Sequence, residues 1–305
     1  MPGDQFSFWK GILIFLAAIA FIITWMAMIL ILVRINWKPF KSKQPYVLLV
    51  SLVASTFWWI GSAQSLGVIP QVGIFSDCAF WTIWIQLVFG VQLAITCMAY
   101  RLLRLYYILV LSKVPDTIVF PLIIFLSHLP SVILGILPIL RPNYYVTQFP
   151  SPIKANPTGP PACDFTIHPY YINVMFSCAG VGLVVLSFLN YKISRVRRAF
   201  NEFKEINTAL YVLTVILLLN VALNAAGFQN YDAGKGFSLL TQIVACMTMF
   251  WSIMFASVRG YLTDKDGYFS QWKQGLKDES LPSALQYGAE GTSTYCTTDH
   301  TKSTA

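Results

Sequence analysis

Charged residues are scarce along this chain. Asp, Glu, Lys and Arg make up 11% of its 305 residues, against about 25% in ordinary soluble domains, while 56% of the residues are hydrophobic. This composition predicts an integral membrane protein in contact with a lipid bilayer. The net charge of +8 does not indicate a nucleic-acid partner, because the basic residues are split among short loops rather than gathered on one face.

Motifs for catalysis and ion coupling are missing as well. The sequence has no H-E-x-x-H pair, no glycine-rich phosphate loop and no Walker pattern, and no Asp or Glu falls within any predicted membrane span. A retinal protein needs a lysine in its last span, and the last predicted span, residues 237–258, has none. We therefore expect no enzyme activity, no cofactor and no metal site, and a pump or ion-coupled transporter is disfavoured.

Six cysteines in so long a chain are too few for a disulfide scaffold. Three of them fall inside apolar runs, where a reduced thiol behaves as a small hydrophobic group: Cys97, Cys178 and Cys246. Cys78 precedes an apolar run and Cys163 lies in a proline-rich loop, both on the predicted outer side. We expect these two to form a disulfide that holds the loop over the mouth of the bundle, with two free thiols as the alternative.

Long apolar runs are abundant. The 22 residues between Cys78 and Arg101 contain no Asp, Glu, Lys or Arg, and as a helix they would cross about 30 Å of hydrocarbon. Similar runs recur along the chain, and the predicted spans are residues 11–33, 46–68, 79–100, 117–140, 170–190, 207–228 and 237–258. The predicted fold class is an all-α membrane protein, a seven-transmembrane helix bundle.

The basic residues orient this bundle. Twelve Lys and Arg residues fall in three predicted cytoplasmic loops, 34–43, 101–113 and 192–204, against four on the other side: Lys10, Arg141, Lys154 and Lys235. The positive-inside bias predicts the N-terminus outside and the C-terminus inside, in a multi-pass plasma-membrane protein. The proline-rich stretch 141–168 is predicted to be an external loop without helix.

Residues 1–262 form the predicted membrane domain, and residues 263–305 a cytoplasmic tail. Large apolar side chains recur at helical spacing among the lysines of the tail: Tyr268, Phe269, Trp272 and Leu276. They predict a short helix in the cytoplasmic interface, with a disordered juxtamembrane segment as the alternative. Beyond Ser280 the chain is rich in Ser and Thr, and we expect disorder there.

The inner ends of the third and sixth spans carry opposite charges. Arg101 and Arg104 end the third span, and Glu202 lies close to the start of the sixth. An Arg–Glu contact at this point would bias the bundle between two helix arrangements. Only one of the two arginines can face Glu202, because residues three apart on a helix differ by about 60° in direction. The alternative is that both arginines anchor the helix at the lipid headgroups.

Two of these segments resemble a known family. The run F-N-E-F-K, from Phe200 to Lys204, resembles the F-N-E-A-K signature at the start of the sixth helix of class C G-protein-coupled receptors. The C-x-x-x-R-x-x-R-L run that ends the third span, together with the placement of Cys78 and Cys163, is similar to the seven-helix part of plant and fungal receptors linked to a regulator-of-G-protein-signalling domain. The resemblance covers residues 10–260. Met98 departs from it, because such receptors often carry a basic residue there.

The resemblance implies a receptor-like protein that transmits an extracellular cue to a heterotrimeric G protein, with Arg101, Arg104, Glu202 and Lys204 at the coupling and switch region. A membrane transporter of a small solute is the alternative, and a homodimer is left open. A small-molecule or peptide ligand would meet polar and aromatic side chains in the outer half of the bundle: Gln86, Asn220, Asn224 and Trp84. Interhelical hydrogen bonding is the other interpretation of these polar residues, and of Gln64 and Gln242.

Overall fold

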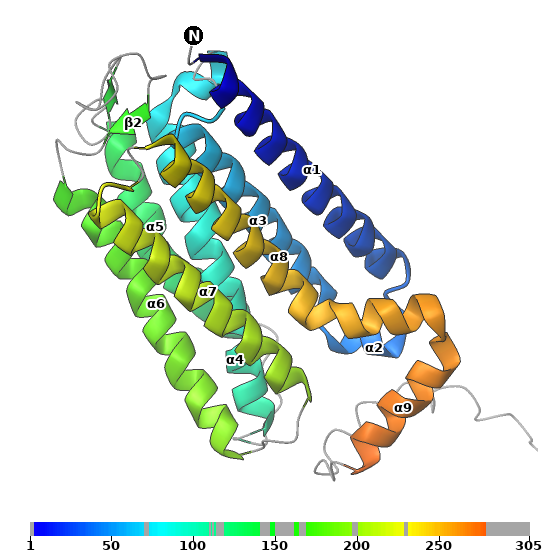
Figure 1. The fold of residues 1–305 in the computed structure, drawn as a ribbon. Helices are drawn as coiled ribbons and strands as arrows, with labels where there is room; N and C mark the ends of the chain where they lie inside the picture. The colour runs from blue at the N-terminus through cyan, green and yellow to red at the C-terminus, as the bar shows by residue number, and fades with distance from the viewer. Residues whose placement is uncertain are drawn as a thin grey trace, which may run out of the picture.

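The computed structural model describes residues 3–69, 73–109, 111, 113, 119–140, 147–149, 162–164, 169–196, 201–228 and 231–278, without the side chains of some residues, among them 162–164, 201–205 and 224–225. Long apolar helices dominate this part of the chain (Figure 1). They are α1 (Gly3–Val33), α3 (Pro45–Ser65), η2 (Ala79–Gln92), α4 (Leu93–Leu109), α5 (Val119–Leu140), α6 (Pro169–Val196), α7 (Asn201–Ala225) and α8 (Asp232–Thr263).

These helices form one bundle in which the chain runs back and forth between two ends (Figure 1). The upper end in Figure 1 holds the start of α1, and the lower end holds the short helix α2 (Lys38–Ser42) and the terminal helix α9 (Lys265–Asp278). Neighbours in sequence are neighbours in space, and α8 packs back against α1 and α3. The helices therefore close a ring in chain order, with η2 and α4 acting together as its third member.

The third member of the ring has two parts. Residues 79–92 form a π-helix, η2, which continues without a break into α4. A π-helix of 14 residues is long for a form that mostly occurs as single-turn bulges. Its main partner is α3, while α4 packs against α6 and α3. This member is also the most deeply buried of the apolar helices, so it forms the inner wall of the bundle.

Six of the described helices are long and apolar enough to cross a membrane: Phe8–Val33, Pro45–Ser65, Ala79–Ile108, Asn173–Ile193, Ile206–Leu223 and Asp232–Thr263. The helix predicted over 117–140 is present as α5, but its described apolar stretch, Phe125–Leu137, is shorter. The predicted helical, multi-pass architecture is thus confirmed. The count of seven spans and the orientation stay predictions.

Several predicted boundaries are wrong. The charged loop expected over 192–204 is largely helical, because α6 continues to Val196 and α7 begins at Asn201. The last helix begins at Asp232 rather than Phe237, so it takes in both Asp232 and Lys235. We expected no Asp or Glu in any span and no lysine in the last one. Both expectations are wrong, because the last candidate span, Asp232–Thr263, contains these two residues. Both residues lie in the first turn of α8.

The stretch expected to be a plain external loop contains a small hairpin. Strand β1 (Thr147–Phe149) pairs antiparallel with β2 (Ala162–Asp164), and Gln148 lies opposite Cys163. The hairpin lies at the upper end, and β2 approaches α3 (Figure 1). The backbone of Cys163 is thereby placed at the upper end of the bundle.

The tail forms a helix, α9, where the sequence predicts one, so the alternative of a disordered segment is wrong for residues 265–278; its place in the cytoplasmic interface stays a prediction. The turn between α8 and α9 is fixed by Asp264, whose carboxylate accepts a hydrogen bond from the backbone N–H of Gly267 at 2.9 Å. Tyr268 packs on Trp37, with ring centroids 5.8 Å apart, and its hydroxyl lies 3.2 Å from that of Ser257. The residues beyond 278 lie outside the description.

Candidate functional site

Helix α3 and η2 approach each other at backbone distance. A Cβ atom built on Gly61 would lie 2.7 Å from Cβ of Gln86 and 2.8 Å from its backbone nitrogen. On the other side of the contact, a Cβ on Gly90 would lie 2.7 Å from Cα of Trp58. Small residues at such positions let two membrane helices pack closely. Gln86, a predicted ligand residue, is therefore held at the α3/η2 contact.

Buried polar atoms gather in the upper half of the bundle around α3. Side-chain atoms there that are buried and have no hydrogen-bond partner in the described structure are Trp59 Nε1, Ser62 Oγ, Thr82 Oγ1, Trp84 Nε1, Gln86 Oε1 and Gln242 Oε1. Buried polar groups normally find a partner, and each one left alone costs about 1–3 kcal/mol. A concentration of such groups is a reason to look there for bound water or a ligand.

The contact between α3 and α8 gives the register of this region. Cys246 Sγ lies 3.5 Å from the backbone oxygen of Ser55, which it meets as a weak donor. The two helices run in opposite directions, so Trp59, one turn above Ser55, and Gln242, one turn above Cys246, lie at about the same height, and two further turns along α8 lead to Lys235. A buried polar seam therefore runs up from Trp59 and Gln242 to the end of the bundle.

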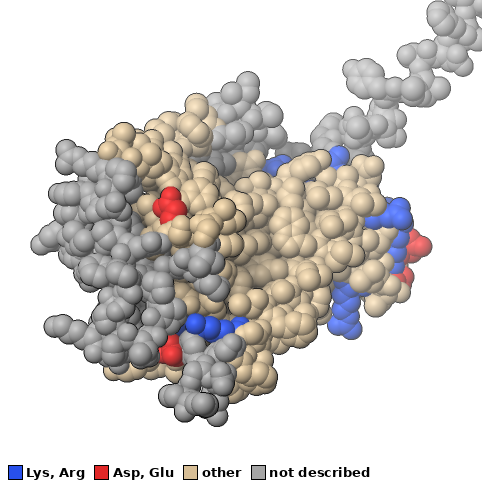
Figure 2. All heavy atoms as spheres, turned by 90° about the horizontal axis from the view of Figure 1, so that it is seen from above, with Lys and Arg blue, Asp and Glu red and all other residues tan. Residues whose placement is uncertain are grey.

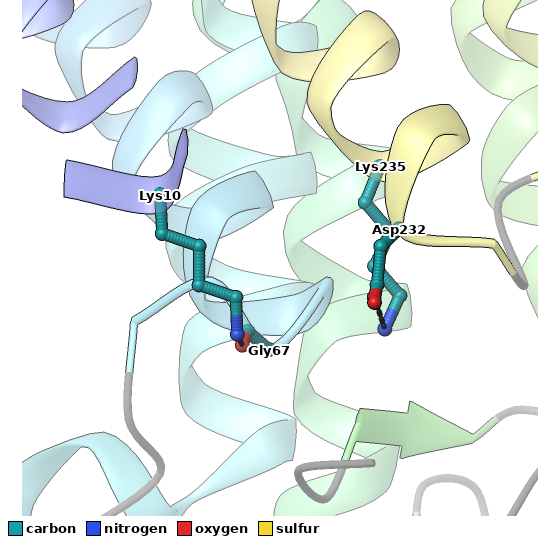
Figure 3. A network of polar contacts seen from close by, with 4 residues as sticks. All are labelled: Lys10, Gly67, Asp232 and Lys235. Atoms are coloured by element: carbon teal, nitrogen blue, oxygen red, sulfur yellow. Dashed lines mark hydrogen bonds and ion pairs between the residues drawn. The ribbon is translucent and has the colours of Figure 1, made fainter. Parts of the chain in front are cut away.

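Two polar pairs lie at the top of this seam, Lys10 with Gly67 and Lys235 with Asp232 (Figure 3). Lys235 on α8 is buried, with a side-chain exposure of 8%, and its Nζ lies 4.0 Å from the carboxylate of Asp232, whose side chain is 38% exposed. Lys10 on α1 donates a hydrogen bond to the backbone oxygen of Gly67 at 3.3 Å. Lys10 also lies close enough to interact electrostatically with both Asp232 and Lys235. Sequence reasoning missed this site because it placed Lys235 in a loop.

Asn220 serves the contact between α7 and α8. Its Nδ2 donates to Thr241 Oγ1 at 3.2 Å, and Ser238 donates to its Oδ1. Both partners are on α8, so the interhelical interpretation of Asn220 is the one that the structure shows. The side chain of Asn224 lies outside the description, and Trp84 is half-buried on η2, near Gly135 of α5. The three predicted ligand residues whose side chains are described make different contacts: Gln86 with α3, Trp84 with α5, and Asn220 with α8.

The two arginines at the lower end differ in burial. Arg101 is buried, with 4% exposure, whereas Arg104 is half-buried one turn further on. Met98 lies one turn above Arg101 and is also buried. The backbone of Glu202 and Lys204 is in the first turn of α7, and their side chains lie outside the described residues. The structure thus singles out Arg101 as the arginine that faces the interior.

Cys78 is buried at the start of η2 and its sulfur is in a disulfide. The free thiols of the described chain are Cys97, Cys178 and Cys246, as the sequence indicated. The partner sulfur of Cys78 belongs to a side chain outside the description, so the pairing with Cys163 stays a prediction.

No metal cluster is found in the described ranges, where no three His, Cys, Asp or Glu side chains lie together. No protein-family model and no curated protein matches the chain. The class is defined by the structure itself: this is a multi-pass helical membrane protein with a buried polar seam at one end of its bundle.

Proposed function

We propose that this protein is a plasma-membrane receptor that passes an extracellular cue to a heterotrimeric G protein, with the upper end of the bundle outside and the lower end inside. The observation that carries the proposal is the cluster of buried polar atoms without partners in the upper half, around α3. Six of the twelve such atoms in the described residues lie there. A molecule arriving from outside would find hydrogen-bonding groups there.

The same distribution argues against the alternative, a solute transporter. A transport path needs polar groups along both halves of the membrane, because the solute must lose its water and regain it. At the lower half the described packing around α4 is mainly apolar, with buried side chains that include Leu102, Leu105, Ile193, Ile206 and Leu210. A buried polar region at one end and a mainly apolar core at the other suit detection better than passage.

The lower end supplies the features that a cytoplasmic partner would meet. Arg101 is buried on α4 about two turns before that helix ends at Leu109, and α7 begins at Asn201, within the F-N-E-F-K run that resembles class C receptors. We infer that Arg101 and Glu202 belong to the switch, and that Arg104 and Lys204 contact the partner. Separation of α7 from α4 would expose this surface to the cytoplasmic partner. Such a movement would couple ligand binding at the upper end to partner binding at the lower end.

A disulfide between Cys78 and Cys163 belongs to the same proposal. It is supported by the bonded sulfur of Cys78, by the position of β2 at the upper end, and by the free state of three other cysteines. Cys296 is the remaining cysteine, and in the proposed orientation it lies on the reducing side of the membrane.

The test uses the full chain in lipid nanodiscs with a panel of purified G proteins. A library of small molecules and peptides is screened for nucleotide exchange, with empty nanodiscs as the control. We expect at least one compound to accelerate exchange on one G-protein type. Solute flux into protein-containing vesicles without any exchange would overturn the proposal and favour the transporter.

A further inference from the structure

The first turn of α8 combines three sources of positive potential. Lys235 places a buried ammonium group there, and its described charged contact is Asp232 at 4.0 Å, which is too long for a hydrogen bond. Lys10 adds a second ammonium within electrostatic reach. The third source is the helix itself, because the backbone N–H groups at an α-helix N-terminus carry a partial positive charge.

That helix end has no side-chain cap. The residue before the first turn, Tyr231, makes no capping hydrogen bond with its side chain. The close contact of Gly234 with the backbone oxygen of Phe228 leaves no room for a side chain at position 234, where a Cβ would lie 1.9 Å from that oxygen. Because Tyr231 supplies no capping oxygen, the first-turn N–H groups keep the partial positive charge that attracts anions to helix N-termini.

Among the described side chains, the carboxylate that lies against this charge is that of Asp232. Asp232 is 38% exposed and lies at the edge of ion-pair distance from Lys235, so much of its interaction is with solvent. Lys235 is buried, and burying an ammonium group is costly unless acceptors surround it. Seen from above, most of the described surface at this end carries neither acidic nor basic side chains (Figure 2).

A second observation points into the same seam. Ser62 and Gln242 are at least nine-tenths buried, and each has a side-chain oxygen without a partner in the described structure. By the register set at Ser55 and Cys246, Gln242 lies two turns, or about 10 Å, below Lys235 on the same face of α8. The polar seam thus continues from the charged cluster into the bundle.

We propose that the first turn of α8 is an anion-binding site, in which the Lys235 ammonium and the first-turn N–H groups hold a carboxylate or phosphate group while Lys10 adds to the attraction. This chemistry fits a small soluble oxyanion or the headgroup of an anionic lipid at the membrane surface. The site is independent of whether the protein signals or transports.

The experiment measures thermal unfolding of the full chain in phosphatidylcholine nanodiscs during titration with sodium acetate or inorganic phosphate at constant ionic strength set by chloride. A ligand that binds the folded state raises the unfolding temperature. A parallel arm replaces part of the phosphatidylcholine with phosphatidylglycerol and adds no soluble oxyanion. A rise in the first arm identifies a soluble ligand, and a rise confined to the second identifies a lipid headgroup; either result supports the site.

Variants connect the shift to the named residue. Lys235→Gln should weaken binding about tenfold or more, because a charge-assisted hydrogen bond is lost, whereas Lys235→Arg should keep it. Lys265→Gln, an exposed lysine at the lower end, is the matched control and should bind as the parent does. No shift with either anion or with anionic lipid overturns the proposal, and so does an equal shift in Lys235→Gln.

Discussion

Gly260 on α8 lies directly under the ring of Tyr268 on α9, so closely that a Cβ at position 260 would lie 2.3 Å from the ring carbons Cγ and Cδ2. This contact, together with the hydroxyl pair Ser257–Tyr268, docks the terminal helix against the end of the last span. The position of α9 therefore depends on residue 260 being a glycine, because any Cβ there would overlap the Tyr268 ring.

Gly260→Ala is expected to displace α9 from α8. The added methyl overlaps the base of the Tyr268 side chain, and overpacking of this kind costs about 1–3 kcal/mol. Hydrogen exchange of residues 265–278 should become faster in the variant. Gly236→Ala is the matched control, because a Cβ there meets nothing within 4 Å, and it should leave exchange in α9 unchanged. Equal exchange in both variants would show that the contact does not hold the helix.

Gly61→Ala is expected to lower the stability of the whole bundle. The new Cβ would lie 2.7 to 2.9 Å from Gln86 Cβ, N and Cα, and backbone atoms in a packed helix pair give way little. A loss of about 1–3 kcal/mol is expected, seen as a lower unfolding temperature in detergent. Gly180→Ala should be neutral or slightly stabilising, since its Cβ would meet open space. Equal unfolding temperatures for Gly61→Ala and Gly180→Ala would show that the close α3/η2 contact does not stabilise the bundle.

A disulfide between Cys78 and Cys163 predicts a linked peptide pair in a non-reducing digest, which mass mapping would detect. Cys163→Ser is expected to reduce stability by at most about 4–5 kcal/mol, because the bridge closes a loop of about 85 residues. Cys178→Ser is the control, since that thiol is free and half-buried. Recovery of both cysteines as unlinked peptides would contradict the pairing.

The switch predicts a reciprocal effect between Arg101 and Glu202. Glu202→Arg should raise basal nucleotide exchange, and adding Arg101→Glu should restore the resting rate. Arg104→Glu is the matched second site, and it should restore nothing, because Arg104 is the less buried of the two arginines. Surface expression of each variant is measured in parallel. Additive effects of the Arg101 and Glu202 changes would mean that the two sites are not coupled.

The proposed orientation predicts that the two termini are reached from opposite sides of the membrane. An N-terminal tag should bind antibody on intact cells, and a C-terminal tag should bind only after permeabilisation, in accord with the positive-inside bias. If both tags are reached from the same side, the number of spans is even. The seven-span prediction would then be wrong, and α5 would be the helix that does not cross the membrane.

Long apolar runs made the helices predictable, because each helix in a membrane must satisfy its own backbone and must be apolar over about 20 residues. Helix ends were less predictable. The sequence D-A-G-K-G looks like a loop because it is polar and glycine-rich, yet α8 begins there, and Gly234 packs against the backbone oxygen of Phe228. The tertiary contact decides the boundary, and no local pattern records it.

The candidate site was predictable only in part. Gln242 stands out in an apolar run, so a polar role was evident from the sequence. Ser62 did not stand out, because serine is common where membrane helices pack, and its buried oxygen becomes notable only once its neighbours are known. Helix geometry required a choice between Arg101 and Arg104, but only packing against the rest of the bundle shows which one points inward.

The glycine contacts between α3 and η2 make this helix pair the more rigid part of the bundle. Two helices that meet backbone to backbone move as one body, since sliding either would bring Gly61 or Gly90 against main-chain atoms. By contrast, 17% of the α6 span and 28% of the α7 span are buried, against 72% of the span formed by η2 and α4. Helices with few buried contacts cost least to displace. In the receptor proposed above, we therefore expect activation to tilt α6 and α7 against the closely packed pair of α3 and η2.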